Sequence, residues 1–487
     1  MMKMNSSGKT KHNLAYVIAI CSVAALGGLL QGYDTSVISG VIEPLNQYFS
    51  LTPSQTGWAV SSIVIGCVAG AYLAGALADR YGRKMALIIT VFLMMISVLG
   101  MALATNFTWF IIFRILGGFG IGLASVVSPI YMTEVAPSEY RGRVVTMNMI
   151  CFVGGQVLVL IVNYLIVRSA GESWIVEQGW RYMLGFGFIP CVLFLIFVGF
   201  IPESPRWNVM KGRDSAALHT LTRISNESHA HSVLQDIKDS FIIKTPAEQA
   251  KANVTGKPNK SAIFIIIAIL IACFNQLTGI NVIQYFGPTL LMNVTGNMQE
   301  AMFMVTWLAG LQFLGVLAGM SMVDRLGRRK LLLIGSFGTF VCLALTFATF
   351  YFGVRGFTSI IGLLGFMFIF GMTWAQIAWT VVGEILPNRL RAMGMGLAYA
   401  AMWGSNFIIS QIFPVLNDNP WLREKFHGGF PLLLFSICCL ISWLFVHRYL
   451  PETKGVALEK IEELIVFGKK GQSQGKDSVA ATDLSVK

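Results

Sequence analysis

Apolar runs of about 20 residues recur along the whole chain, and this pattern restricts the fold more than any other feature of the sequence. A helix of that length crosses the hydrocarbon core of a bilayer. Hydrophobic residues make up 55% of the 487 residues and charged residues only 12%, which is about half the share typical of soluble domains. The sequence therefore predicts an all-α integral membrane protein with twelve transmembrane helices. The expected spans are 14–41, 57–77, 86–104, 107–131, 144–168, 183–201, 262–293, 301–321, 331–352, 358–382, 392–416 and 429–450.

Basic residues concentrate in every second connection between these spans. Because basic loops stay on the cytoplasmic side, both termini are expected in the cytoplasm, and the plasma (inner) membrane is the expected location. The net charge of +12 follows from this bias and from basic termini, so membrane lipid is an expected partner and nucleic acid is not. The even-numbered connections carry Arg80, Arg83, Lys84, Arg141, Arg143, Arg325, Arg328, Arg329, Lys330, Arg389 and Arg391.

The eight cysteines all lie within apolar spans. A disulfide framework or a metal site is therefore not expected. The first span is longer than the apolar region of a signal peptide, and no small-residue cleavage site follows it. It is expected to remain attached as a helix.

Three motifs occur twice, about 250 residues apart, which indicates a duplicated six-helix unit. Asp79-Arg80-Tyr81-Gly82-Arg83 recurs as Asp324-Arg325-Leu326-Gly327-Arg328, Glu134 and Arg141 recur as Glu384 and Arg391, and Pro202-Glu203-Ser204 recurs as Pro451-Glu452-Thr453. The expected parts are a cytoplasmic N-terminus (1–13), an N-terminal six-helix half (14–201), a cytoplasmic linker with short helices (202–260), a C-terminal six-helix half (261–450) and a cytoplasmic tail (451–487).

Six motifs, in this order along the chain, resemble the signature set of the sugar porter family. They are Gly32-Tyr33-Asp34, the Asp79–Lys84 motif, Arg141-Gly142-Arg143, Pro202–Trp207, Gln276–Asn281 and Pro451–Gly455. The family includes bacterial D-xylose proton symporters and animal glucose facilitators. The resemblance covers about Leu29 to Gly455 and implies the major facilitator fold, with two pseudo-symmetric halves. It implies transport of a sugar or polyol without a cofactor, and we expect the monomer to be the functional unit.

Asp34 is a carboxyl group within an otherwise uncharged apolar stretch, 16–42. A buried acid is costly in a membrane unless it has a function. A low dielectric favours the protonated form of a carboxyl group, and a nearby cation favours the charged form, so its protonation can change with conformation. In the resembling symporters an Asp and an Arg at these positions form the coupling pair, which implies Arg114 as the partner and the proton as the coupling ion. The alternative is a permanently ionised Asp34–Arg114 bridge that only fastens two helices.

Gln276 and Asn281 are the strongest candidates for substrate contact. They are five residues apart, or about 140° around a regular helix, so the sequence predicts a break at Gly279 that brings both amides to one cavity between the halves. Amides suit hydroxyl groups because each offers a donor and an acceptor without a charge. Trp379 offers a flat apolar face for a sugar ring, and Gln156 matches another polar position of the family. The alternatives are interhelical hydrogen bonds for the amides and packing for the tryptophan.

Several positions depart from the family pattern. The family's sugar-contacting glutamines fall here on Met149, Asn275 and Met402, and Ala375-Gln376 replaces a helix-breaking Gly-Pro in the tenth helix, which argues against the usual bend. Gln31 and Gln284 stand where apolar or aromatic residues are more usual. If Gln31, Gln284 and Gln376 face the cavity, the substrate is a sugar or polyol different in shape from glucose or xylose. The alternative is that these glutamines point toward neighbouring helices.

Charged residues at the cytoplasmic helix ends are expected to form a latch that links helices in one state and separates in another. The members are Asp79, Arg80, Arg83, Glu134 and Arg141 in the first half and Asp324, Arg325, Arg328, Glu384 and Arg391 in the second. The alternative is a set of solvated pairs, which contribute little. Tyr285 and Phe286 are candidates for an extracellular aromatic gate, with plain packing as the alternative.

Proton-coupled uptake of a sugar or polyol by alternating access is the expected function. An uncoupled facilitator of the same substrate class and a non-transporting sugar sensor are the alternatives. The tail after Leu450 is short for a sensor. The polar residues form no nucleophile-and-base set and no metal-ligand spacing, so we expect no enzymatic activity.

Overall fold

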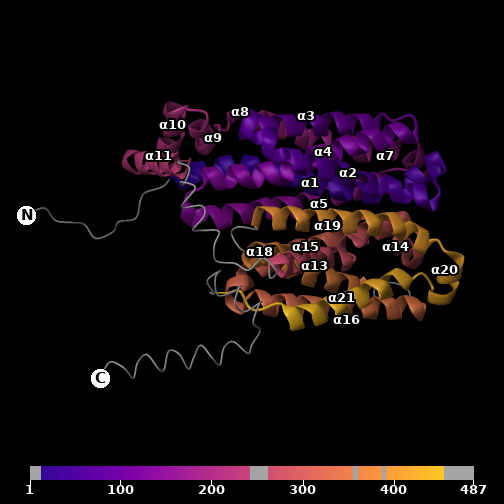
Figure 1. The fold of residues 1–487 in the computed structure, drawn as a ribbon. Helices are drawn as coiled ribbons and strands as arrows, with labels where there is room; N and C mark the ends of the chain where they lie inside the picture. The colour runs from indigo at the N-terminus through magenta and orange to yellow at the C-terminus, as the bar shows by residue number, and fades with distance from the viewer. Residues whose placement is uncertain (1–12, 242–260, 355–359, 387–390, 455–487) are drawn as a thin grey trace, which may run out of the picture. The chain divides into compact units, whose positions relative to one another are not determined.

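The computed structural model describes residues 13–241, 261–354, 360–386 and 391–454, and every regular element in these ranges is helical (Figure 1). The chain divides into two compact units. Unit 1 holds the described residues of 1–52 and 58–249, and unit 2 holds 53–57 and the described residues after 249. The first five residues of the helix that begins at Pro53 are thus grouped with unit 2.

Unit 1 is a bundle in which α1 lies beside α5 and α3 lies beside α4 (Figure 1). Glycines make the first of these contacts close: a Cβ on Gly32 of α1 would collide with the backbone of Phe152, and one on Gly155 of α5 would collide with the backbone of Leu29. Small residues allow such approach between membrane helices. The elements are α1 (Leu14–Phe49), α2 (Pro53–Tyr81), α3 (Arg83–Ala102), α4 (Phe107–Val135), η1 (Ser138–Tyr140), α5 (Arg141–Ser169), α6 (Glu172–Trp174), the π-helix η2 (Ile175–Gly179), α7 (Trp180–Gly185), α8 (Phe188–Phe200), α9 (Pro205–Met210), α10 (Asp214–Ile224) and α11 (Glu227–Phe241).

Unit 2 is a second helical bundle, in which α13 lies beside α19, α15 beside α17, and α16 beside α21. Its helices are α13 (Ser261–Leu277), α14 (Ile280–Thr295), α15 (Met298–Leu326), α16 (Arg328–Tyr351), α17 (Ile361–Met372), α18 (Trp374–Ile385), α19 (Arg391–Asn417), α20 (Pro420–Phe426) and α21 (Phe430–Tyr449). The tenth predicted span corresponds to α17 and α18 together.

Eleven helical segments of the described chain are long and apolar enough to cross a membrane. The protein is therefore a multi-pass membrane protein. The eleventh predicted span, 392–416, corresponds to α19, which has 27 residues but is not in that apolar set. Its sequence includes several Gly, Asn, Ser and Gln residues, which lower its hydropathy although its length suffices for a span.

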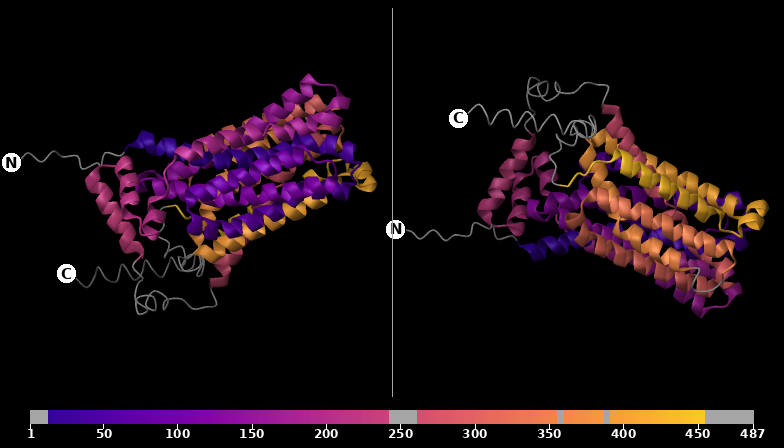
Figure 2. Two further views of the ribbon diagram at one scale, coloured as in Figure 1. Left: turned by 90° about the horizontal axis from the view of Figure 1, so that it is seen from above. Right: turned by 90° about the horizontal axis from the view of Figure 1, so that it is seen from below.

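The short helices α9, α10 and α11 pack on the end of the unit 1 bundle at which α1 begins (Figure 2). Their own core consists of Ala217, Leu221, Ala230 and Leu234. The backbone N–H of Asn13 donates to the carbonyl of Ile224 at 2.8 Å, which joins the start of α1 to the end of α10. The helices predicted for the linker thus form part of unit 1, whereas residues 242–260 lie outside the described chain.

The expectation of no bend in the tenth helix is wrong. Helix α17 ends at Met372 and α18 begins at Trp374, with Thr373 between them at φ −120° and ψ −83°. The Thr373 hydroxyl donates to the carbonyl of Ile369 at 2.7 Å, and its N–H is shared between the carbonyls of Ile369 and Phe370. Such side-chain bonding to the previous turn often accompanies a bend. The tenth span is thus broken here without a Gly-Pro pair.

Candidate functional site

The predicted break in the seventh span is confirmed. Helix α13 ends at Leu277 and α14 begins at Ile280, with Gly279 between them in the left-handed region at φ 84°. Glycine has no Cβ and adopts this conformation without steric cost. The break brings the two candidate amides together, because Asn281 Nδ2 donates to Gln276 Oε1 at 2.5 Å.

The amide contact extends into a chain of hydrogen bonds within unit 2. Gln276 Nε2 donates to Asn275 Oδ1 at 3.1 Å, and Asn275 Nδ2 donates to the carbonyl of Trp374 at 3.1 Å. Gln276 and Asn275 are buried, whereas Asn281 is half-buried. The chain of amides therefore connects the break after α13 to the break before α18, and each amide fixes the orientation of the next.

A second amide pair joins α14 to α15. Gln284 Nε2 donates to Gln312 Oε1 at 2.9 Å, and both side chains are buried. Sequence reasoning did not select Gln312. The available signal was a lone amide in the middle of an apolar span, since buried polar groups in membrane helices need partners.

The remaining glutamine candidates differ in their surroundings. Gln376 Nε2 donates to the carbonyl of Val316 on α15 at 2.7 Å, which is the contact expected of a glutamine that links two helices. Gln156 is buried and Gln31 is half-buried, and both belong to unit 1. Met149 is half-buried in unit 1, and Met402 is buried in unit 2.

The aromatic candidates of unit 2 each contact another side chain. Trp379 stacks on Tyr399 with ring centroids 4.2 Å apart and an interplanar angle of 11°. Tyr285 Oη accepts from Asn406 Nδ2 at 3.3 Å, and Phe286 packs on Phe413 with centroids 4.7 Å apart. Trp379 is half-buried, whereas Tyr285 and Phe286 are buried.

Asp34 and Arg114 are both deeply buried, at 5% and 1% exposure. Asp34 is on α1 and Arg114 on α4, and the positive charge of Arg114 acts on the Asp34 carboxyl. Arg114 Nε also donates to the carbonyl of Ala59 on α2 at 2.8 Å. The structure thus places a carboxyl group and a guanidinium group inside unit 1, where the low dielectric strengthens the attraction between opposite charges.

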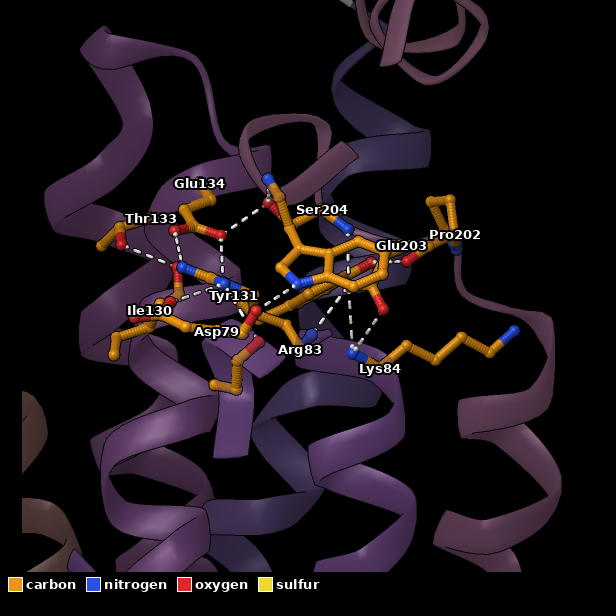
Figure 3. Close-up of polar contacts among 12 residues, drawn as sticks. Asp79, Arg83, Lys84, Ile130, Tyr131, Thr133, Glu134, Pro202, Glu203 and Ser204 are labelled. Carbon is orange, nitrogen blue, oxygen red and sulfur yellow. Dashed lines mark hydrogen bonds and ion pairs between the residues drawn. The ribbon is translucent and has the colours of Figure 1, made fainter. Parts of the chain in front are cut away.

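The charged candidates at one end of unit 1 form a connected cluster (Figure 3). Arg83 binds Glu134 through two bonds, from Nε to Oε2 at 2.8 Å and from Nη2 to Oε1 at 2.9 Å. Its third nitrogen, Nη1, lies 3.0 Å from Asp79 Oδ1 and 3.1 Å from the carbonyl of Ala78. The Ser204 hydroxyl donates to Glu134 Oε2 at 2.5 Å. We call Asp79, Arg83, Glu134, Glu203 and Ser204 the unit 1 charge cluster.

Glu203 binds backbone rather than a cationic side chain. Its Oε1 accepts from the N–H groups of Arg83, Lys84 and Ser204 at 2.9, 3.1 and 2.8 Å (Figure 3). Burial raises the pKa of the Glu203 carboxyl, although these backbone bonds and the charge of Arg83 act in the opposite direction. Glu203 thus caps the start of α3, where N–H groups lack helical partners.

Unit 2 repeats this arrangement with the corresponding residues of its own motifs. Arg328 Nε lies 3.2 Å from Glu384 Oε1, and the Thr453 hydroxyl donates to Glu384 Oε2 at 2.5 Å. Glu452 accepts from the N–H groups of Arg328 and Arg329 at 2.8 and 3.2 Å. We call Arg328, Glu384, Glu452 and Thr453 the unit 2 charge cluster.

Three other latch candidates, Arg80, Arg141 and Arg325, have described contacts with residues outside these clusters. Arg80 lies over the ring of Tyr81 at 5.3 Å, and Arg141 Nε donates to the carbonyl of Ala136 at 3.4 Å. The carbonyl of Arg325 accepts from Lys454 Nζ at 3.0 Å. The side chains of Asp324 and Arg391 lie outside the described residues.

No group of three or more His, Cys, Asp or Glu side chains that could hold a metal ion occurs in the described part of the chain. The eight cysteines are free thiols. The candidate sites described above present amide groups in unit 2 and a buried carboxyl group in unit 1.

Comparison with known proteins relates the chain to carriers of small solutes. A family described as "Sugar (and other) transporter" matches residues 20–465. The D-xylose-proton symporter of Escherichia coli (strain K12) is 34% identical over 93% of this chain and 97% of its own length. The arabinose-proton symporter of Bacillus subtilis (strain 168) is 37% identical over 93% of this chain and 96% of its own length. The inward open structure of the xylose transporter XylE from E. coli matches with a TM-score of 0.81 and 33% identity, over 92% of this chain and 100% of that one.

Proposed function

Because the chain belongs to the sugar (and other) transporter family, we propose that it takes up a sugar or polyol together with a proton by alternating access. The protein is a transporter and not an enzyme. The proposal assigns the substrate class and the coupling ion, and it places both termini in the cytoplasm on the basis of the basic loops. In this proposal the proton is the coupling ion, and no cofactor takes part.

The observation that carries proton coupling is the burial of Asp34 close to a buried cation. A carboxyl at 5% exposure changes its protonation state when its distance from Arg114 or its access to water changes. A transport cycle that alters either quantity can therefore bind a proton in one state and release it in another. Two relatives of this chain are named as proton symporters, which supports the same assignment.

The amide chain of unit 2 supports a neutral, hydroxyl-rich substrate. Gln276 and Asn281 meet at the break around Gly279, and a sugar hydroxyl can exchange with either amide because it both donates and accepts. Gln284 and Gln376 hydrogen-bond a neighbouring helix, so the proposal assigns the substrate to the class of sugars and polyols and not to a particular shape.

In the proposed cycle, the outward-facing state binds a proton at Asp34 and a substrate held by Gln156, Gln276, Asn281 and Trp379. The two halves then rock, the charge clusters rearrange, and substrate and proton are released inside. Symport requires that the empty or half-loaded carrier crosses rarely. Each 100 mV of membrane potential then contributes about 2.3 kcal/mol per proton to accumulation.

Purified protein in liposomes tests this function. An inward proton gradient should drive substrate above equilibrium in the wild type, whereas Asp34→Asn should abolish accumulation but retain substrate exchange. Asp236→Asn, at an exposed position of α11, is the matched control for loss of one carboxylate. Equal uptake with and without the gradient would instead identify an uncoupled facilitator, and absence of any uptake would favour the sensor.

Thermal unfolding in detergent identifies the substrate. Pentoses, hexoses, polyols, disaccharides and sugar acids are screened, because a ligand that binds only the folded state raises apparent stability. A sugar or polyol is expected to raise the unfolding temperature. A response confined to another chemical class would overturn the substrate assignment.

A further inference from the structure

A small cavity lies beside Asp34 inside unit 1. It is lined by residues of α1, α3, α7 and α8, together with the short turn between α7 and α8. The cavity volume is about 10 Å³, which is close to the minimum for one bound water. Most of the lining is apolar, and the polar contributions come from Tyr33, Asp34 and Cys191.

Two polar atoms of the residues that line the cavity are buried without a hydrogen-bond partner among the described residues. They are the hydroxyl of Tyr33 and Oδ2 of Asp34. Tyr33 is 4% exposed and Asp34 is 5% exposed. Leaving a buried polar group unsatisfied costs about 1–3 kcal/mol, and buried waters commonly satisfy such groups. Both residues line the cavity in which such a water would lie.

Gly187 is the residue that keeps the cavity open next to Tyr33. It lies in the turn before α8, and a Cβ built on it would stand 3.0 Å from Cε1 of the Tyr33 ring and 3.4 Å from Cγ2 of Val98. Any larger side chain at this position would therefore press on the tyrosine ring and fill part of the space.

We propose that a water molecule bound in this cavity joins the Tyr33 hydroxyl to the Asp34 carboxyl, so that Tyr33 positions and stabilises the group that carries the coupling proton. The inference rests on the proposed function and deepens it. Tyr33 donates to the water, and the water donates to the carboxylate. When Asp34 takes up a proton, the water turns and accepts from the carboxylic acid. Only the bond between the proton and the carboxyl oxygen and the hydrogen bonds of the water change in this exchange.

Other ionisable groups also face Asp34, and they share in its titration. Arg114 approaches from α4, Cys67 from α2 and Cys191 from α8. Arg114 is the only one of the three that carries a full positive charge in ordinary conditions. A test of Tyr33 must therefore leave Arg114 unchanged and read the carboxyl itself.

Infrared spectroscopy of the purified protein reads that carboxyl directly. The carbonyl stretching band of protonated Asp34 is assigned by its loss in Asp34→Asn and then followed against pH. Tyr33→Phe removes only the hydroxyl and should raise the midpoint by about one pH unit, because the carboxylate loses a hydrogen-bond donor. Gly187→Ala fills the cavity and should shift the midpoint in the same direction.

Tyr16→Phe is the matched control. The Tyr16 hydroxyl is also on α1, is also buried without a hydrogen-bond partner in the described chain, and does not line the cavity. Its removal should leave the midpoint unchanged.

If Tyr33→Phe fails to fold, as judged by thermal unfolding, Gly187→Ala carries the test. An unchanged midpoint in the folded variants, or a wild-type carboxyl that does not titrate, overturns the inference. If the variants shift the midpoint as expected but uptake by the wild type is the same with and without a proton gradient, symport is overturned and this inference stands.

Discussion

The two charge clusters contain residues of the same repeated motifs, yet their arginine–glutamate pairs differ in burial. In unit 1 the side chains of Arg83 and Glu134 are 9% and 10% exposed and are joined by two hydrogen bonds. In unit 2 the side chains of Arg328 and Glu384 are 18% and 28% exposed, and Arg328 Nε lies 3.2 Å from Glu384 Oε1. The residue types of the pair are therefore the same in both units, whereas its burial is not.

This difference has a consequence for which cluster can open. A buried ion pair stabilises strongly only with good geometry, and breaking it leaves a charge in a low dielectric. A pair with access to water loses less, because water replaces the partner. We infer that separating the arginine–glutamate pair costs more free energy in unit 1 than in unit 2.

Removal of the carboxylates should produce the largest difference between the units. Glu134→Ala leaves Arg83 buried without its main partner and should cost about 3 kcal/mol of stability. Glu384→Ala leaves a better solvated arginine and should cost about 1 kcal/mol. Chemical unfolding of both variants in detergent measures the two losses.

Double variants complete this measurement. Glu134→Ala combined with Arg83→Ala, and Glu384→Ala combined with Arg328→Ala, give the coupling energy of each pair. A larger coupling energy in unit 1 is expected. Equal values for the two pairs would contradict the comparison.

Arginine-to-lysine exchange should produce the next largest difference. Arg83 directs three nitrogens to Glu134, Asp79 and the Ala78 carbonyl, and a single ammonium group cannot reproduce that planar geometry. Arg83→Lys should therefore cost about 2 kcal/mol, and Arg328→Lys less. Thermal unfolding compares the two variants, and a greater loss in Arg328→Lys would reverse our order.

Some features of these sites follow from the sequence, and others depend on packing that the sequence does not show. The Asp-Arg-x-Gly-Arg repeat predicts the clusters. Gly279 predicts the helix break, because the amides of Gln276 and Asn281 would point in different directions on a regular helix. The partner of Glu134 is different: Arg83 and Glu134 are on different helices, so no helical spacing reveals the pair. Arg141, which the motif placed with Glu134, instead bonds the Ala136 carbonyl.

Gln312 and Thr373 illustrate a second reason for such gaps. A single glutamine in an apolar helix gives no indication of which neighbour it meets, and its contact with Gln284 depends on how α14 and α15 pack. Thr373 lies at the break of the tenth span and bonds the preceding turn, but Thr90 and Thr306 make the same bond within continuous helices. Local sequence therefore predicts the elements better than it predicts the contacts between them.

Removal of the hydroxyl groups should give a smaller effect than either change above. Ser204 and Thr453 each donate to the carboxylate of their own cluster at 2.5 Å. Ser204→Ala should cost about 1.5 kcal/mol, because hydrogen bonds to charged groups are the stronger ones. Thr453→Val should cost less, since Glu384 is the more exposed acceptor. Unfolding of the two variants under one condition checks the order, and a larger loss for Thr453→Val would contradict it.

The pH dependence contributed by Glu203 should be the smallest effect. Burial raises the pKa of this carboxyl in the folded protein, so the folded state holds the proton more tightly than the unfolded state. The stability that Glu203 contributes is therefore greatest at low pH and falls as pH rises from its ordinary pKa through the raised value. Glu203→Gln cannot titrate, so the unfolding temperature of the wild type minus that of this variant should decrease across the same window. Glu139→Gln, at an exposed position of η1, controls for the lost charge. A difference that increases with pH would contradict this prediction. It would show that the backbone hydrogen bonds to Glu203 stabilise the carboxylate more than burial destabilises it.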